Sequence, residues 1–435
     1  MMAYMKRNRL LVIATLLLFA CKGQTGAAFV KTQNGQFMLN GSAYYFMGTN
    51  YWYGGILGLT PQGKERLVKE LDYLKQNNIT VLRVLAAAEG HGPIHGKMTV
   101  EPAYQTAPGI FNDEALNGLD FLLAEMGRRN LKAVLYLSNN WEWSGGFLQY
   151  LNWAGILPDS TLRGHIAWDD YRDWVSGFYK SDSCKNMYRR QLERIVSRNN
   201  SITGIPYKND PAIFAWQLAN EPRPMRPSSI PDFVQWVADM SALIKKIDPN
   251  HLVSAGCEGG EHIEGAQVYD TVHRLPTIDY ATIHIWPKNW GWFTDTSLHK
   301  GMDSVLQKSN RYINGHIAAA KSFNKPMVIE EFGMPRDLHV YKPGTPVAAR
   351  DTYFASVIEH WVNSAKTDGV VAGFSFWAFG GMAKANPTSD YYVKGADLMG
   401  DPPQEEQGLN TVFISDSTTW KLMANSYERA FSKNQ

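Results

Sequence analysis

Short apolar runs alternate with longer amphipathic stretches along most of the chain. Eight runs have the length and composition of buried strands: Tyr44–Gly48, Ile79–Leu85, Lys132–Leu137, Ile213–Leu218, Leu252–Ala255, Ala281–Ile285, Met327–Ile329 and Gly373–Phe376. Between them, apolar residues recur at helical spacing, as in Glu65–Gln76, Ala115–Arg129, Phe233–Ile247 and Ser304–Phe323. This alternation predicts a parallel sheet closed into a (β/α)8 TIM barrel. A doubly wound open sheet is the alternative, but no Gly-x-Gly-x-x-Gly motif opens a helix after a strand.

Three segments fall outside this alternation. Phe29–Lys31 and Gln36–Leu39 flank Asn34-Gly35, which predicts a β-hairpin that covers the bottom of the barrel. The connection from Ser138 to Asp210 is rich in aromatic residues, and the connection from Gly380 to Leu409 is rich in Gly, Pro and Asp. Both leave the carboxyl ends of strands, where barrel active sites are built, so we expect these long βα loops to form the walls of a cleft.

The first residues have the pattern of an export signal. Lys6, Arg7 and Arg9 precede the apolar run Leu10–Ala20, and Leu18-Phe-Ala-Cys21 resembles a bacterial lipobox. We expect residues 1–20 to be a signal peptide, 21–28 a tether from lipidated Cys21, and 29–435 a single barrel domain. The chain would then be exported and lipid-anchored to the outer membrane, in the periplasm or at the cell surface. Because Phe19 is bulky for a lipobox, ordinary cleavage and secretion is the alternative.

The composition of the chain limits the kinds of molecule that it is expected to bind. A formal net charge of +2 provides no basic field for nucleic acid, and we expect a monomer that meets a membrane only through its lipid anchor. Cys184 and Cys257 are expected to be separate buried thiols, with a disulfide as the alternative. No Cys/His cluster has the spacing of metal ligands, so we expect no metal site. Most of the 14 Trp and 21 Tyr belong in a core, but some are expected to line a sugar cleft.

Polar and aromatic residues collect where the predicted strands end. In strand order they are Asn50 and Trp52, Arg83, Asn139 to Trp141, Asn220 and Glu221, Glu258, His284 and Trp286, Glu331, and Trp377. Glu221 and Glu331 end strands on opposite sides of the predicted barrel, so they can face each other across its mouth. Cleavage of a glycosidic bond needs such a pair, one acid for the leaving oxygen and one carboxylate at the sugar carbon. A spacing of about 5 Å would indicate a retaining enzyme, and about 6.5–9.5 Å an inverting one.

Two of these strand ends resemble known motifs. Trp216-Gln-Leu-Ala-Asn-Glu-Pro222 is similar to the acid/base strand of glycoside hydrolase family 5, in clan A, and Ile329-Glu-Glu-Phe-Gly333 resembles its nucleophile strand. Gly48-Thr-Asn-Tyr-Trp-Tyr53, Asn140-Trp-Glu-Trp-Ser-Gly-Gly146 and Ile283-His-Ile-Trp-Pro287 resemble the endo-β-1,4-mannanase branch, as does Glu221-Pro-Arg223. The resemblance implies retaining hydrolysis of mannan, glucomannan or galactomannan, with β-mannan and manno-oligosaccharides as substrates.

The resemblance also implies roles for single residues. Glu221 would be the acid/base, with a raised pKa, and Glu331 the nucleophile, kept ionised by Arg83. Asn220 would hold the 2-hydroxyl, His284 would join the carboxylate network, and Trp377 would lie under the sugar. The flanking subsites are assigned to Trp52, Trp141, Trp143 and Arg223. Trp286 stands where the family usually has Tyr, and its indole N–H can donate but not accept. No cofactor is implied, because side chains supply both steps.

Glu330 serves as an internal control for the strand register. Neighbouring residues on a strand point to opposite faces, so we expect Glu331 in the pocket and Glu330 turned towards the surrounding helices or the loop rim.

Two other functions remain open. The same fold and carboxylates would suit a β-1,4-glucanase, because the sequence does not show how the pocket treats the axial 2-hydroxyl of mannose. A surface lipoprotein that binds polysaccharide without cutting it would have lost one of the two carboxylates, and both are present.

Overall fold

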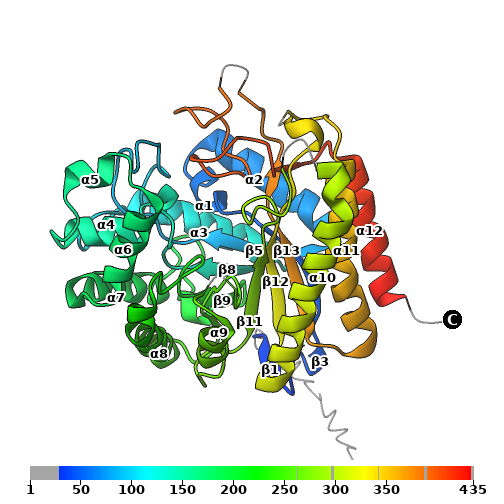
Figure 1. Ribbon diagram of the computed structural model, residues 1–435, viewed down its shortest axis with the longest axis horizontal. Coiled ribbons are helices and arrows are strands. Elements are labelled where there is room, and N and C mark those ends of the chain that lie inside the picture. The colour runs from blue at the N-terminus through cyan, green and yellow to red at the C-terminus, as the bar shows by residue number, and fades with distance from the viewer. Residues whose placement is uncertain (1–28, 262, 295–297, 341, 387–388, 433–435) are drawn as a thin grey trace, which may run out of the picture.

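The computed structural model describes residues 29–432, apart from 262, 295–297, 341 and 387–388. Its centre is a sheet of eight parallel strands, as the sequence predicts. The strands are β4 (Phe46–Asn50), β5 (Ile79–Leu85), β8 (Lys132–Tyr136), β9 (Ile213–Gln217), β10 (Leu252–Ser254), β11 (Ala281–Ile285), β12 (Met327–Phe332) and β13 (Val371–Phe376). Helices surround this sheet (Figure 1). The fold is therefore the predicted (β/α)8 barrel.

The strand order explains how the barrel closes. The sheet runs β10-β9-β8-β5-β4-β13-β12-β11, so β13, the last strand of the barrel, pairs with β4, the first. Between β10 and β11 individual hydrogen bonds replace a regular ladder: Asp279 N donates to Val253 O (2.8 Å) and His284 N donates to Glu258 O (2.7 Å). The junction between β10 and β11, next to His284, is therefore closed by separate hydrogen bonds and not by continuous strand pairing.

Helices connect the strands and cover their outer faces. The longer ones are α2 (Pro61–Gln76), α3 (Asp113–Arg128), α6 (Trp168–Phe178), α7 (Asp182–Val196), α8 (Ile230–Ile247), α10 (Leu298–Phe323), α11 (Ala348–Thr367) and α12 (Ser417–Phe431). The shorter ones are α1 (Gly54–Leu57), α4 (Gly146–Trp153), α5 (Asp159–Arg163) and α9 (Ala266–His273), with single turns η1 (Glu142–Ser144), η2 (Tyr207–Asn209), η3 (Pro227–Ser229) and η4 (Asp337–His339). The four predicted helices match α2, α3, α8 and α10.

Local sequence explains where several helices begin. Thr60 accepts a hydrogen bond from Gly63 N and is followed by Pro61, a combination that starts α2. Asn112 accepts from Ala115 N at the start of α3, and Ser181 accepts from Cys184 N at the start of α7. Because the sequence prediction followed apolar periodicity, it placed the starts of α2, α3, α8 and α10 too late. In α2 and α3 a polar capping residue and the first helical residues precede the positions from which the prediction began.

The predicted hairpin closes the bottom of the barrel. Strands β1 (Lys31–Gln33), β2 (Gln36–Leu39) and β3 (Ser42–Ala43) form an antiparallel sheet, which lies below the barrel strands in Figure 1. The Phe37 ring packs edge-on against Phe214 (5.1 Å between centroids) and Tyr280 (5.3 Å). Tyr44 N also donates to Phe37 O (2.8 Å), so this stretch extends the bottom sheet and β4 begins only at Phe46.

The two long connections lie at the other end. The segment from Ser138 to Asp210 contains α4, α5, α6 and α7, and the segment after β13 carries β14 (Phe379–Gly381), which pairs with β15 (Val412–Phe413). The latter is the orange trace above the strands in Figure 1. Minor strands β6 (Gln105–Ala107) and β7 (Ile110–Phe111) form a further hairpin.

Two further predictions can be compared with the structure. Cys184 and Cys257 are separate buried thiols, as expected. The predicted signal peptide and tether, residues 1–28, lie outside the described residues. Within the described part of the chain, every helix is too short or too polar to cross a bilayer.

Candidate active site

A cleft of about 950 Å³ opens at the carboxyl ends of the barrel strands. Its floor includes Asn220, Glu221, Glu331 and Trp377. The connection after β8 contributes Trp141, Glu142, Trp143 and Trp168 to the walls, and the connection after β13 contributes Tyr391, Gln404, Glu405, Glu406 and Leu409. The prediction that these two long loops form the cleft walls is confirmed.

Glu221 follows β9 in an unusual backbone conformation. Its φ is 49°, in the left-handed region that non-glycine residues rarely adopt. Its N–H donates to Gly256 O (3.0 Å) and Asn140 N donates to Asn220 O (2.9 Å), so neighbouring loops hold the turn. Backbone strain of this kind persists where the surroundings fix it and is concentrated at functional sites. Here it keeps the carboxylate in the cleft.

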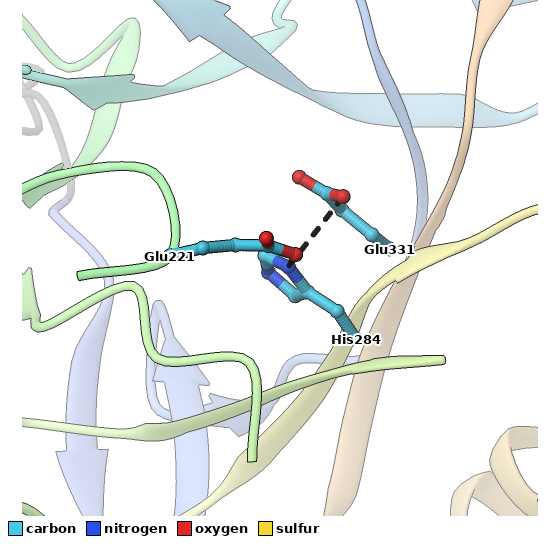
Figure 2. A group of neighbouring side chains, drawn as sticks. All are labelled: Glu221, His284 and Glu331. Atoms are coloured by element: carbon cyan, nitrogen blue, oxygen red, sulfur yellow. Dashed lines mark hydrogen bonds and ion pairs between the residues drawn. The ribbon is translucent and has the colours of Figure 1, made fainter. Parts of the chain in front are cut away.

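Glu221, His284 and Glu331 converge on one another from three different strand ends (Figure 2). His284 Nδ1 lies 2.6 Å from Glu221 Oε1 and 3.5 Å from Glu331 Oε2. One carboxylate oxygen of each glutamate and a ring nitrogen of His284 all lie within 4.8 Å of one another. The two predicted catalytic carboxylates therefore meet, with His284 beside both.

Arg83 holds the Glu331 carboxylate from inside the barrel. Its guanidinium is fully buried and contacts the Glu331 carboxylate, and it also donates to Asn50 Oδ1 (3.0 Å) and Asn220 Oδ1 (2.7 Å). Arg83 Nε donates to Gln217 Oε1 (2.8 Å). The planar fork of donors on arginine suits such a set of fixed acceptors, so Arg83 aligns groups from several strands.

Trp286 and Trp377 complete this side of the floor. Trp286 Nε1 donates to Glu331 Oε2 (3.1 Å), so the indole supplies a hydrogen bond to this carboxylate. Its ring packs edge-on against Trp377 at 5.8 Å. A Cβ on Gly333 would lie 2.5 Å from the Trp286 ring, which explains the glycine of the Glu-Phe-Gly motif. Among the described residues, the buried Nε1 of Trp377 has no hydrogen-bond partner.

The expected pKa pattern of the two carboxylates is wrong. Burial opposes ionisation of Glu221, but the hydrogen bond and charge of His284, with Arg223 nearby, lower its pKa to about 2. Burial and the charge of Glu221 raise the pKa of Glu331 against His284 and Arg83. Burial lowers the pKa of His284, but Glu331, Glu221 and Glu330 outweigh it and raise the pKa to about 10. The directions of these shifts favour an ion pair in which His284 holds the shared proton.

The predicted orientation of Glu330 is also wrong. Its Oε2 accepts from Gln217 Nε2 (2.6 Å) and lies 3.5 Å from Arg83 Nε, inside the barrel. Pairing along β11 and β12 goes from Ile283 with Ile329 directly to His284 with Glu331, a register shift that leaves Glu330 as an extra residue. A bulge of this kind breaks the alternation of side chains. Both glutamates consequently face the interior.

The opposite side of Glu221 carries an aromatic and basic group. Trp141 Nε1 donates to Glu221 Oε2 (2.6 Å), and the Arg223 guanidinium lies 4.9 Å from the Trp141 ring centre. Arg223 forms an ion pair with Glu258, and Trp290 Nε1 donates to Glu258 Oε1 (3.2 Å). Burial raises the pKa of Glu258 to about 7. Arg223 therefore links two acidic groups at the edge of the cleft.

The remaining predicted tryptophans divide into two cases. Trp143 is buried but lines the cleft. Trp52 does not line it: the side chain is 1% exposed, and its Nε1 donates to Gly400 O (2.9 Å). Trp52 thus packs under the loop after β13, and its assignment to a sugar subsite is wrong. The position of a tryptophan just after a strand therefore did not show whether its ring lines the cleft or packs beneath a loop.

Sequence analysis missed several residues of the cleft. Glu405 lines it, and burial raises its pKa to about 8, together with the charges of Asp401, Glu331 and Glu221. Trp168 is 53% exposed and stacks on Trp141 (6.2 Å) and Tyr171 (5.8 Å). Glu405 lies in a long loop without a regular element, and Trp168 is the first residue of α6, inside the long connection after β8. Their residue types alone gave no signal for this position.

The triad of Glu221, His284 and Glu331 is also the one group of acidic, His and Cys ligands in the described chain whose spacing could suit a metal ion. The residues are far apart in sequence, so motif spacing could not reveal them. However, His284 Nδ1 lies 2.6 Å from Glu221 Oε1, and the neighbouring carboxylates raise the pKa of His284, which favours a proton on this nitrogen. A protonated nitrogen has no lone pair to give a metal, so the arrangement fits acid–base chemistry.

A buried pair of carboxylates at the mouth of a (β/α)8 barrel, in a cleft lined with tryptophan, defines the class of barrel glycoside hydrolases.

Comparisons with known proteins give the family. Residues 27–435 match the model of a glycoside hydrolase family 5 β-mannosidase-like family, and the chain belongs to glycoside hydrolase family 5.

Two plant relatives cover most of the chain. Mannan endo-1,4-beta-mannosidase 7 of Arabidopsis thaliana is 32% identical over 80% of this chain and 77% of its own. Mannan endo-1,4-beta-mannosidase 1 of Oryza sativa subsp. japonica is 28% identical over 98% of this chain and 95% of its own.

Solved structures agree with this assignment. The family 5 mannosidase from Rhizomucor miehei superimposes with a TM-score of 0.83 at 32% identity, covering 93% of this chain and 98% of its own. The endo-1,4-beta-mannanase from the same organism shares the fold, with a TM-score of 0.66 at 24% identity, 93% of this chain and 100% of its own.

Proposed function

We propose that the protein hydrolyses internal β-1,4-mannosidic bonds of mannan, glucomannan or galactomannan with retention of configuration. One observation carries the mechanism: an oxygen of Glu221 and an oxygen of Glu331 lie within 4.8 Å of each other. Retaining enzymes have carboxyl groups about 5–5.5 Å apart, whereas inverting enzymes leave room for a water between them. The names of the plant relatives support mannan as the substrate and endo cleavage as the mode.

In the first step, Glu331 attacks the anomeric carbon of the sugar and forms a covalent glycosyl–enzyme bond. The glycosidic bond breaks, and its oxygen leaves with a proton from Glu221. Arg83 and Trp286 hold Glu331 through contacts to its two oxygens, so the attacking carboxylate has a fixed orientation. Asn220, fixed by Arg83, is placed to hold the 2-hydroxyl. Trp377 supplies the surface beneath the sugar ring.

The proton reaches Glu221 from His284. These groups are 2.6 Å apart, so transfer across their hydrogen bond turns Glu221 into the acid. As the Glu331 carboxylate is consumed in the covalent bond, the imidazolium loses one of its counter-charges, which favours this transfer. In the second step, ionised Glu221 takes a proton from water, and the resulting hydroxide equivalent releases the sugar from Glu331.

The substrate test compares polysaccharides and product sizes. The protein is expected to release reducing sugar from mannan, glucomannan and galactomannan, and not from carboxymethylcellulose. Internal cleavage gives a ladder of oligosaccharides from the start, while release of mannose alone would contradict endo action. Activity on carboxymethylcellulose alone would favour the glucanase. The β-anomer as the first product, seen by NMR, would establish retention.

Two substitutions test the roles of the carboxylates. Glu331→Gln is expected to lose several orders of magnitude in rate on every substrate, because no nucleophile remains. Glu221→Gln should lose activity on mannan but still undergo the first step with an aryl mannoside, whose leaving group needs no acid. Glu65→Gln is the control, because Glu65 pairs only with Lys69 on the exposed face of α2. Equal losses of Glu221→Gln on both substrates would contradict the acid role.

We propose further that Cys21 anchors the exported protein to a membrane as a lipoprotein and that the mature protein acts as a monomer. The charged start, apolar run and lipobox-like Leu18-Phe-Ala-Cys21 support the anchor. In bacterial expression, labelled palmitate should enter the native chain and not a Cys21→Ser variant. Release of the native chain into the medium without label would favour plain secretion.

A further inference from the structure

We propose that Glu330 is a positioning residue for catalysis: a third buried carboxylate that holds His284 as the doubly protonated imidazolium and directs its Nδ1–H at Glu221. This inference rests on the proposed acid–base role of Glu221, but its structural part can be tested without any substrate. The charge of Glu330 would act through His284 and not through contact with the sugar.

The first support is the geometry on the two sides of the imidazole. His284 Nδ1 lies 2.6 Å from Glu221 Oε1, within hydrogen-bond distance, while Nε2 lies 3.6 Å from Glu330 Oε2. This buried Nε2 has no hydrogen-bond partner in the described structure, and the Glu330 carboxylate lies at ion-pair distance from it. A neutral imidazole would have only one N–H and would leave one of these carboxylates facing a lone pair. The imidazolium offers an N–H to each.

The second support is that a strand irregularity and several polar contacts hold the charged side chain of Glu330 inside the barrel. A bulge in β12 places it on the same face as Glu331, and its side chain is buried. Gln217 Nε2 donates to its Oε2 at 2.6 Å, and Arg83 Nε lies at 3.5 Å. Removing a carboxylate from water costs several kcal/mol unless cations compensate it. A residue with only a packing role would not require that charge.

The third support is the charge balance around His284. The charged groups that surround it from the neighbouring strand ends are Glu221, Glu258, Glu330, Glu331, Arg83 and Arg223. Arg83 is shared between Glu330 and Glu331, and Arg223 between Glu258 and Glu221. Two fixed cations thus face four carboxylates, and an imidazolium reduces the imbalance. Glu330 is the carboxylate on the side of His284 away from the cleft.

The test follows the titration of His284 by NMR in chains with isotope-labelled histidine, using the lost signal of His284→Asn for assignment. In the native protein at neutral pH both ring nitrogens should be protonated, and the imidazolium should persist into the alkaline range. In Glu330→Gln the midpoint should fall by at least about one pH unit, because a nearby opposite charge shifts a pKa by about 1–3 units. The alkaline limb of kcat/KM should move in the same direction.

Two further variants separate charge from packing. Glu330→Asp keeps the charge and should leave the His284 midpoint near that of the native protein. Glu70→Gln removes a different buried carboxylate, one bonded to Arg66 and Tyr51 away from His284, and should not move the midpoint.

Three results would overturn the proposal: a native His284 with one unprotonated nitrogen at neutral pH, an unchanged midpoint in Glu330→Gln, or equal shifts in Glu330→Gln and Glu70→Gln. The first result is measured on the native protein, so it does not depend on whether a variant folds. Because none of these readouts uses mannan, failure of the proposed substrate would leave them interpretable.

Discussion

At the scale of single residues, each catalytic carboxylate owes its properties to its donors. The Glu331 carboxylate forms hydrogen bonds with Arg83 and Trp286, while the Glu221 carboxylate forms them with His284 and Trp141. The sequence identified both carboxylates because each ends a strand within a recognisable motif. It could not predict their relative pKa values, because these depend on His284, a partner from a third strand.

The contact of Trp286 with Glu331 can be tested by Trp286→Phe. A hydrogen bond to a charged group contributes about 1.5–3 kcal/mol, and about 1.4 kcal/mol corresponds to tenfold in rate. We expect kcat/KM on mannan to fall by about 10- to 100-fold while the ring still packs against Trp377. The matched control is Trp236→Phe, since the buried Trp236 Nε1 has no hydrogen-bond partner in the described structure. Native kcat/KM in Trp286→Phe would show that the indole N–H is dispensable.

At the scale of secondary structure, the strands were predictable and their irregularities were not. All eight runs became strands because continuous apolar runs between helices can be buried on both faces. The bulge at Glu330 could not be foreseen, since alternation of side chains was the rule used to place that residue. The position of Glu405 was equally hidden, because loop geometry depends on contacts distant in sequence. Trp168 begins α6, a helix within the long connection that the prediction did not place.

Helix α9 gives a test of pH dependence at this scale. Burial lowers the pKa of His273, on this helix, from 6.5 to about 3. A histidine with a lowered folded pKa stays neutral in the native state while the unfolded chain takes up a proton, so stability is lost as pH falls from about 6.5 towards 3. Each pH unit in this window removes up to about 1.4 kcal/mol for one such group.

Substitution of His273 by Phe should therefore flatten this dependence. The ring would keep its packing against Phe323, with which His273 stacks at 6.1 Å, and would have no proton to gain. Denaturant unfolding of both proteins at several pH values measures the effect, and the two should differ most at the acid end. Parallel curves would show that His273 does not contribute.

At the scale of the whole molecule, the two ends of the barrel have different tasks. The amino ends of the strands are sealed by an aromatic cluster around Phe37, and the carboxyl ends hold the cleft. The sequence predicted this division from the hairpin signal and from the strand-end residues. It did not reveal the incomplete ladder between β10 and β11, because strand composition does not report how a barrel closes.

This division can be tested by Phe37→Ala. Truncating a buried phenylalanine costs about 3–5 kcal/mol of unfolding free energy, whereas kcat on mannan at moderate temperature should stay native because the cleft is at the opposite end. Ile110→Ala, at a position 60% exposed, should change stability by less than about 0.5 kcal/mol. A large drop in kcat for folded Phe37→Ala would show that the two ends are coupled.

The cleft walls have a consequence for how such an enzyme diversifies. Glu221, His284 and Glu331 project from strand ends, whereas much of the cleft wall comes from two surface segments, between residues 138 and 210 and between 380 and 409. Insertions and deletions in surface loops are tolerated far better than changes in a barrel interior. The preferred polysaccharide can therefore change through either segment over evolutionary time, while the reaction itself is inherited intact.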